Sequence, residues 1–175
     1  MKLINKGFTL IELLIVIAIL GTLAVVVLVA IDPVQQLAKT RDSGRFSGVG
    51  QLGRNIQAYS TNNAGELPTA DAQWAQTLVD SGEITTLPSG INYSAGSISN
   101  CTTNVVNDTW CYNANANGQA IVFARLEANS NINKCPSGLV ASAWIAYLTT
   151  AGRAGTLCTN GNEPAPSTSP SAFMD

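Results

Sequence analysis

The sequence predicts an α+β protein in which a long N-terminal hydrophobic α-helix packs against a small antiparallel β-sheet head. An apolar run from Phe8 to Ile31 contains a single charged residue, Glu12. A stretch with helical periodicity follows it, and short β-rich segments separated by Asn, Gly and Ser come last. These changes of pattern divide the chain into residues 1–7, an apolar helix at 8–31, an amphipathic continuation at 32–62, a globular head at 63–162 and a flexible Pro/Ser-rich tail at 163–175.

The apolar run is long enough to cross a membrane as a helix. From Leu13 to Ile31 no residue is charged, and ~19 residues rising ~1.5 Å each cover ~28 Å, close to the ~30 Å bilayer core. Lys2 and Lys6 precede the run, so the positive-inside rule places the N-terminus in the cytoplasm and the head outside.

Glu12 distinguishes this segment from an ordinary export signal. A secretory signal has an apolar core of only ~7–15 residues. A plain signal anchor explains the length but gives no reason for a carboxylate in the span, which costs up to ~3 kcal/mol at mid-bilayer. Glu12 is therefore predicted to have a function.

The residues around Glu12 resemble those of a known family. The segment Lys6-Gly7-Phe8-Thr9-Leu10-Ile11-Glu12-Leu13-Leu14 is similar to the leader junction of class III signal peptides, which occur in type IV pilins and type II secretion pseudopilins. The resemblance implies that prepilin peptidase removes residues 1–7 by cutting between Gly7 and Phe8, and that it methylates the new amino group of Phe8. Glu12 is then the fifth residue of the mature chain, as the family pattern requires.

Cleavage would also give Glu12 a partner. A cationic amine on Phe8 would lie one helical turn away, and the same two groups could pair between neighbouring subunits of a fibre. At ~4 Å and an effective dielectric constant of ~20, such a pair attracts by ~4 kcal/mol before desolvation. The alternative is a lone Glu12 that reaches the membrane surface beside an uncleaved leader.

The resemblance implies a structural subunit with the ladle-shaped arrangement of pilins. Its single-pass helix would hold it in the inner membrane with the head outside. The pilus assembly machinery would then build it into a self-polymer, an extracellular type IV pilus that serves adhesion, twitching motility or DNA uptake. A pseudopilin of a type II secretion system is the same-family alternative. A membrane-anchored adhesin that never polymerises is the alternative from another class.

Composition argues against catalysis and against nucleic-acid binding. The chain has no histidine, which removes the usual general base near neutral pH and the commonest metal ligand. The net charge is −2 and only 11% of the residues are charged, so no general field attracts a polyanion. We therefore predict no enzyme, no catalytic residue and no cofactor.

The amphipathic continuation is predicted to lie under the head. Apolar residues recur in it at spacings of three and four, at Val49, Leu52, Ile56 and Tyr59. Pro33 lacks a backbone donor and should kink the helix. Four basic residues could contact lipid phosphates or acidic surfaces of neighbouring subunits, or could form a solvated face; they are Lys39, Arg41, Arg45 and Arg54.

The head is predicted to contain one short helix and three or four antiparallel strands. Thr69 or Asp71 can cap a helix that carries Trp74 and Leu78 and that Ser81-Gly82 ends. The β-rich segments are 91–98, 109–113, 120–126 and 143–148. Their aromatic residues are expected in the core or in cross-strand pairs rather than on a ligand surface; these are Trp110, Tyr112, Trp144 and Tyr147.

Four cysteines, Cys101, Cys111, Cys135 and Cys158, lie in the second half of the chain. Behind an export signal an even number of cysteines predicts disulfides, here two. Three pairings are open. Local loop closure favours Cys101 with Cys111 and Cys135 with Cys158.

A calcium site is the weaker of two interpretations of the Asn-rich segment 113–118. Asn113, Asn115 and Asn117 alternate before Gly118 as in the first half of an EF-hand loop, but no carboxylate is present among them. Asn117-Gly118 between two strand-like segments is instead typical of a type I′ hairpin. A calcium site completed by Asp108 or another loop carboxylate is the alternative, since some secretion pseudopilins, which the leader junction resembles, bind calcium in loops of the β-region.

Overall fold

The first helix, α1 (Leu10–Ile31), exposes its side chains along its whole length. The computed structural model describes residues 7–94, 101–136 and 142–174, and none of the 22 residues of α1 is buried in it. Asp32 ends the helix in the left-handed conformation, at φ 44°. The chain divides into two units, residues 1–36 and residues 37–175.

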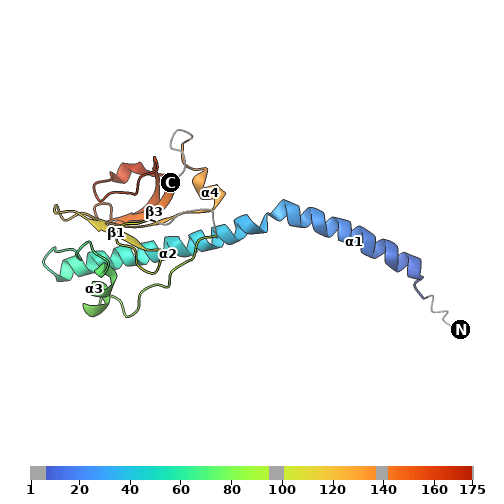
Figure 1. The fold of residues 1–175 in the computed structure, drawn as a ribbon, viewed down its shortest axis with the longest axis horizontal. Helices are drawn as coiled ribbons and strands as arrows, with labels where there is room; N and C mark the ends of the chain where they lie inside the picture. The colour runs from blue at the N-terminus through green and yellow to red at the C-terminus, as the bar shows by residue number, and fades with distance from the viewer. Residues whose placement is uncertain (1–6, 95–100, 137–141, 175) are drawn as a thin grey trace. The chain divides into compact units, whose positions relative to one another are not determined.

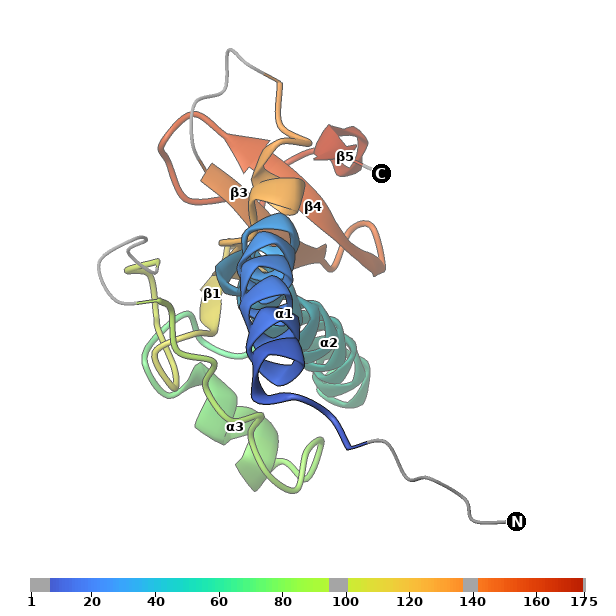
Figure 2. The same ribbon diagram turned by 90° about the vertical axis from the view of Figure 1, so that its right-hand side faces the viewer.

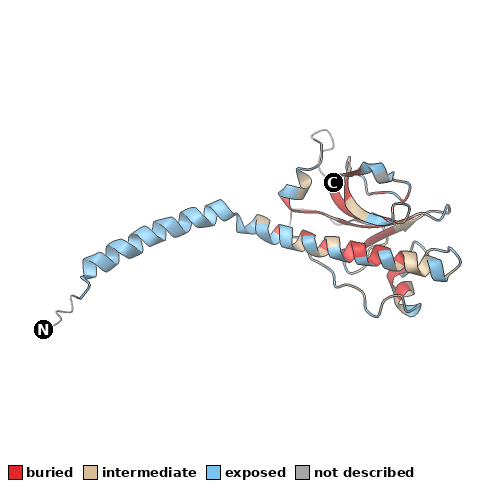
Figure 3. Ribbon diagram, turned by 180° about the vertical axis from the view of Figure 1, so that it is seen from behind, coloured by how far each residue is buried: buried red, intermediate tan, exposed pale blue. Residues whose placement is uncertain are grey.

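The second helix, α2 (Pro33–Asn62), supplies one wall of the head. Its buried residues form a stripe that runs along one side of the helix (Figure 3). The predicted apolar positions lie on this stripe, with Val49, Leu52 and Ile56 buried and Tyr59 packed against the same core. The stripe also contains a charged pair, Asp42 and Arg45, which the apolar periodicity does not predict.

Two glycines of α2 allow the sheet to approach the helix closely. A Cβ atom added to Gly48 would overlap the indole of Trp110, and one added to Gly53 would overlap the ring of Tyr147. Glycine inside a helix costs ~0.5–1 kcal/mol relative to alanine. At these two positions the cost is offset, because the absence of a side chain lets Trp110 and Tyr147 contact the helix backbone.

The sheet contains five strands in the order β1-β2-β3-β4-β5, and each strand pairs antiparallel with the next. Their bounds are β1 Cys111–Ala114, β2 Ala120–Arg125, β3 Ser142–Leu148, β4 Arg153–Thr159 and β5 Phe173–Met174. Three of the four predicted segments therefore form strands. In the segment predicted at 91–98, residues 91–94 form no strand, and the remaining residues lie outside the described part of the chain.

The hairpin between β1 and β2 is confirmed, but its turn is not of type I′. Three residues, 116–118, connect Asn115 to Gln119, and Gly118 has a φ of 73° whereas Asn117 has no positive φ. The side-chain oxygen of Asn115 accepts hydrogen bonds from the backbone N–H groups of Asn117 and Gln119, both at 3.1 Å. These bonds favour the longer loop, with a single left-handed residue at its end.

A short helix, α3 (Trp74–Asp80), lies beside α2 (Figure 1). Trp74, Ala75 and Leu78 are buried, and the helix ends at Ser81-Gly82 as predicted. The predicted cap is wrong, because Gln73 occupies the N-cap position without a side-chain bond. Asp71 instead accepts a hydrogen bond from the N–H of Gln73 at 2.8 Å.

The two faces of the sheet are covered differently. α2 and α3 lie on one side of the strands (Figures 1 and 2), where they form the larger core with Trp110, Tyr112 and Tyr147. On the other face Phe123 and Trp144 pack with Phe173 from the C-terminal segment. A last short helix, α4 (Asn129–Ile132), follows β2.

The C-terminal segment is more ordered than its composition suggests. Residues 163–175 were expected to form a flexible tail, yet Pro164, Pro166 and Phe173 are buried and β5 pairs with β4. Glu163 accepts hydrogen bonds from Thr102 and Thr103. The buried ring of Phe173 and the carboxylate of Glu163 thus hold this Pro- and Ser-rich segment against the rest of the head.

Candidate functional site

The predicted processing site lies immediately before α1 and is open to its surroundings. A Cβ atom added to Gly7 would meet no other atom within 4 Å. The side chain of Phe8 is 87% exposed. The described atoms next to this backbone therefore leave space for an incoming protease.

Thr9 and Glu12 form a capping box at the start of α1. The carboxylate oxygen Oε2 of Glu12 accepts hydrogen bonds from the backbone N–H of Thr9 at 2.9 Å and from its hydroxyl at 2.8 Å. The N–H of Glu12 donates to Oγ1 of Thr9 at 3.3 Å. Sequence reasoning missed this role of Thr9, although Thr-x-x-Glu before an apolar run is a known signature of it. The box uses residues on the mature side of the predicted cut.

α1 presents an uncovered apolar surface on all sides. Its large hydrophobic side chains range in exposure from 47% at Val16 to 82% at Leu10. The described helical stretch from Leu10 to Asn62 contains a segment long and apolar enough to cross a membrane. This segment is compatible with a single-pass membrane anchor of the kind typical of pilins. Burying one such side chain is worth ~1.5–3 kcal/mol, so α1 needs lipid or other helices around it.

Pro33 stands at the first position of α2, and Asp32 precedes it. Oδ1 of Asp32 accepts a hydrogen bond from the N–H of Gln35 at 3.2 Å. Proline is well suited to the first helical position, because its missing N–H would have no partner there. The kink expected at Pro33 stays a prediction.

A buried ionic network joins α2 to the segment after β2. Nη1 of Arg45 lies 2.8 Å from Oδ1 of Asp42, and its Nη2 lies 2.9 Å from Oε2 of Glu127. Arg41 donates to the other carboxylate oxygen of Glu127 through Nε at 2.7 Å. Asp42 in turn accepts from the N–H of Ala128, the N-cap of α4, at 2.9 Å. The network fixes α4 and the end of β2 to the helix.

The electrostatics of this network favour the ionised carboxylate of Glu127. Burial of Glu127 opposes its ionisation, but hydrogen bonds from Arg41 and Arg45 outweigh it and lower its pKa below the usual range. The guanidinium of Arg45 also lies 4.0 Å from the centre of the Tyr93 ring. Burial raises the pKa of Tyr93 to about 12, against the opposing charge of Arg45. Arg41 and Arg45 therefore stabilise the head through Glu127. Of the four predicted basic residues, only Lys39 and Arg54 are exposed.

The cysteines form two local disulfides. The structure joins Cys101 to Cys111 and Cys135 to Cys158, with sequence separations of 10 and 23 residues. These are the pairs that loop closure favours. The first bridge lies in the core on the second face of the sheet, and the second is half-buried.

The Asn-rich hairpin offers little to a cation. Oδ1 of Asn115, the central predicted ligand, already accepts two backbone N–H groups of its own turn. Among the described residues no three His, Cys, Asp or Glu side chains gather as a metal site would require. The calcium alternative with Asp108 gains no support from this geometry.

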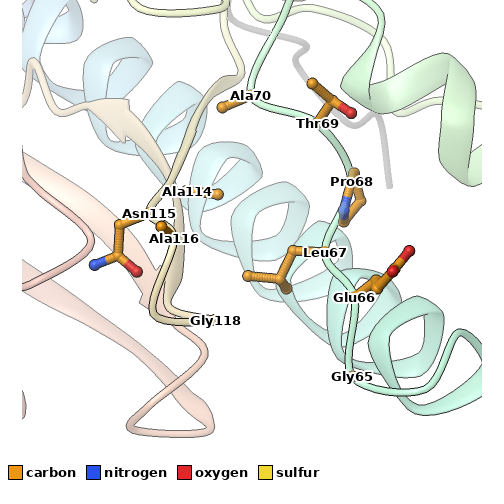
Figure 4. A pocket seen from close by; sticks show the side chains of 10 residues that line it. All are labelled: Gly65, Glu66, Leu67, Pro68, Thr69, Ala70, Ala114, Asn115, Ala116 and Gly118. Atoms are coloured by element: carbon orange, nitrogen blue, oxygen red, sulfur yellow. The ribbon is translucent and has the colours of Figure 1, made fainter.

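The predicted aromatic residues belong to the core, not to a ligand surface. Trp110, Tyr112, Trp144 and Tyr147 are all at most 3% exposed. An open cavity of about 440 Å³ lies instead between the loop 65–70 and the β1–β2 hairpin (Figure 4). Most of its lining side chains are small or apolar, and Glu66 is the only charged one. Nothing in this lining selects a ligand.

One comparison with known proteins produced a match. A family model described as the prokaryotic N-terminal methylation motif matches residues 3–28. This motif is the class III prepilin signal typical of type IV pilins and pseudopilins, and its match confirms the sequence resemblance. No curated protein and no solved structure matched the chain. The matched segment contains Gly7, Phe8, the Thr9–Glu12 capping box and most of α1.

Proposed function

We propose that this chain is a structural pilin subunit that prepilin peptidase processes and that polymerises into an extracellular type IV pilus. The methylation motif supports a type IV pilin-like or pseudopilin protein, a class that is structural and generally non-enzymatic. The observation that carries the proposal is α1, a 22-residue apolar helix without one buried residue, placed directly behind the motif. Such a surface is suited first to a bilayer and then to the packed core of a fibre.

Processing comes first in this proposal. The peptidase cuts the peptide bond between Gly7 and Phe8, and the new amino group of Phe8 receives one methyl group. The exposure of both residues supports access to this bond. The processed subunit stays in the inner membrane, with α1 across the bilayer and the head outside, until the pilus assembly machinery takes it up.

Glu12 is proposed to direct assembly through its second carboxylate oxygen. In the capping box only Oε2 accepts hydrogen bonds from described residues, both from Thr9. Oε1 has no hydrogen-bond partner among them. Cleavage leaves Thr9 in place, so the carboxylate can keep its cap while Oε1 accepts from the methylated amine of a neighbouring subunit. A buried carboxylate thereby gains the opposite charge that it needs in an apolar fibre core.

Two other functions share parts of this evidence. A pseudopilin of a type II secretion system has the same motif and would form a short fibre that does not extend from the cell. A membrane-anchored adhesin would keep its leader and would not polymerise. In the described part of the chain, the aromatic residues that could have lined a ligand surface for an adhesin are buried in the core.

Electron microscopy of filaments sheared from the source cells, with intact-mass analysis of their subunit, tests the proposal. We expect long filaments whose subunit lacks Met1 to Gly7 and carries one added methyl group. Short membrane-bound fibres of the same processed subunit would favour the pseudopilin. A mature form that still contains Lys2 would overturn both.

A further inference from the structure

Charged residues of the head are unevenly distributed along the sequence. No lysine or arginine occurs between Arg54 and Arg125. Four carboxylates of this segment lie in α3 or close to it in the sequence, and we call them the acidic lobe; they are Glu66, Asp71, Asp80 and Glu83. Two exposed lysines, Lys39 and Lys134, form what we call the basic end.

The acidic lobe and the basic end lie at opposite ends of α2. Oε1 of Glu83 accepts a hydrogen bond from Nδ2 of Asn62, the last residue of α2, at 2.7 Å. Lys39 instead lines a small cavity near the start of α2, together with Asn131 of α4. Lys134 follows α4 by two residues. At ~1.5 Å per residue, the 23 positions from Lys39 to Asn62 span ~34 Å.

Neither group is neutralised by the rest of the described chain. In the described part of the chain, Arg41 and Arg45 form ion pairs with Glu127, and Arg45 also forms one with Asp42. All six charges of the lobe and the basic end are outside that network. Glu66, Asp80, Lys39 and Lys134 are exposed. One copy of the head thus offers a negative surface and, far from it, a positive one.

We propose that the acidic lobe of one subunit docks against the basic end of a second copy of this chain. The inference rests on the proposed polymerisation and adds to it a contact between heads. Two different, complementary surfaces on one chain make a heterologous contact, which does not close into a two-fold dimer and forms an open helical array unless its rotation closes a ring. Opposite charges also orient the approaching subunit before contact.

Zero-length cross-linking of intact filaments tests the contact. A carbodiimide activates a carboxyl group, a lysine amine displaces the activated group, and an amide forms while the carbodiimide leaves as its urea. Lys39 and Lys134 are the only lysines after Lys6, so few products can form. We expect amide links from Lys39 or Lys134 to the acidic lobe. Lys39 and Asn62, which contacts Glu83, are ~34 Å apart along α2, so we expect such links to join two copies, which filaments of mixed isotopic labelling verify.

The possible results distinguish a failure of the head contact from a failure of the pilin proposal on which it rests. Filaments without any link between the acidic lobe and the two lysines would overturn the contact but leave the pilin proposal intact. The absence of filaments from the parent protein would overturn both. The double variant Lys39→Arg and Lys134→Arg is the chemical control, since it keeps both charges and removes the reactive amines. It should assemble normally and give no links to the lobe.

Charge reversal provides a second test that does not depend on cross-linking. Glu66→Lys with Asp80→Lys, or Lys39→Glu with Lys134→Glu, should each reduce filament yield by about tenfold, since like charges then meet. Combining all four changes should restore the yield. Asn160→Lys, which adds one charge at an exposed loop position, should leave it unchanged. Failure of the combined variant to assemble better than either pair would overturn the proposed contact.

Discussion

α1 and β3 are built from the same kind of residue and have opposite surroundings. Both are rich in Ile, Leu and Ala, yet all seven residues of β3 are buried and none of the 22 residues of α1 is. Side chains of the head, aromatic residues among them, cover β3, whereas the described chain leaves α1 exposed. Changes in the head should therefore alter the free energy of unfolding, whereas changes in α1 should alter storage and assembly while the head stays folded.

Glu12→Ala should have the largest effect and should act on assembly alone. The change makes α1 more apolar, so membrane insertion should be unchanged or slightly better. Loss of the carboxylate would leave an uncompensated amine in the packed fibre, a defect that costs several kcal/mol in buried pairs. We expect normal subunit levels and few or no filaments, counted by electron microscopy after shearing.

Thr9→Ala is the matched control for this prediction. It removes the hydroxyl that donates to Glu12 but keeps both the carboxylate and the backbone N–H of residue 9. Loss of a helix cap typically costs ~1 kcal/mol, so filaments should persist in reduced number. If Glu12→Ala filaments were as abundant and as shear-resistant as those of the parent, Glu12 would be only a residue at the membrane edge.

Arg45→Ala should have the largest effect on folding. It leaves the carboxylates of Asp42 and Glu127 in the core without their shared partner, and breaking a buried ion pair in this way costs ~3–5 kcal/mol. Urea denaturation of the full chain in detergent, followed by tryptophan fluorescence, measures the change, because Trp74, Trp110 and Trp144 are all buried in the head. Arg54→Ala, at an exposed position of the same helix, should change stability by no more than ~0.5 kcal/mol. Equal effects of the two variants would contradict the assigned role of the network.

A pair of glycine variants examines the contact between helix and sheet at smaller magnitude. Gly53→Ala places a methyl group against the ring of Tyr147, and such overpacking costs ~1–3 kcal/mol. Gly50→Ala meets only the end of the Arg54 side chain, at 3.5 Å. It should stabilise the helix by ~0.5–1 kcal/mol. The same urea experiment should give shifts of opposite sign, and a stabilising Gly53→Ala would contradict the close contact.

The smallest expected effect is a loss of head stability in acid. The folded pKa of Glu127 lies below its unfolded value of ~4.3. Its contribution is therefore fully present above pH ~4.3 and is lost as the pH falls through the lower folded pKa. Glu127→Gln should be less stable than the parent at pH ~6, and the difference between the two urea midpoints should shrink as the pH falls below ~4.3 and through the lower folded pKa. A difference that stays constant as the pH falls would show that the charge of Glu127 is not responsible.

The elements set by local pattern could be predicted from the sequence. The apolar run gave α1, the spacing of Val49, Leu52 and Ile56 gave the buried face of α2, and β-rich segments located three strands. The motif around Glu12 could be recognised because all of its residues are neighbours in the sequence. The capping role of Thr9 had a local signal as well, since Thr9 and Glu12 are three residues apart.

Features that depend on distant residues could not be predicted in this way. Arg45 appeared to be part of a basic helix face, because its partner Glu127 lies 82 residues away in sequence. The sequence of β4 shows no clear alternation of apolar and polar residues. A Cβ atom added to its Gly155 would overlap the ring of Phe173. The same contact explains why the C-terminal segment is held against the sheet. In each case the contact joins residues that are far apart in the sequence and that only the fold brings together.

In the proposed fibre, other copies of α1 cover this helix. A photo-cross-linking residue at Leu20, which is 58% exposed in the single chain, tests this most directly in sheared filaments and in the membrane-stored subunit. We expect cross-links between α1 helices of different subunits in filaments and cross-links to lipid before assembly. Filaments in which residue 20 reacts only with the head or with solvent would contradict it.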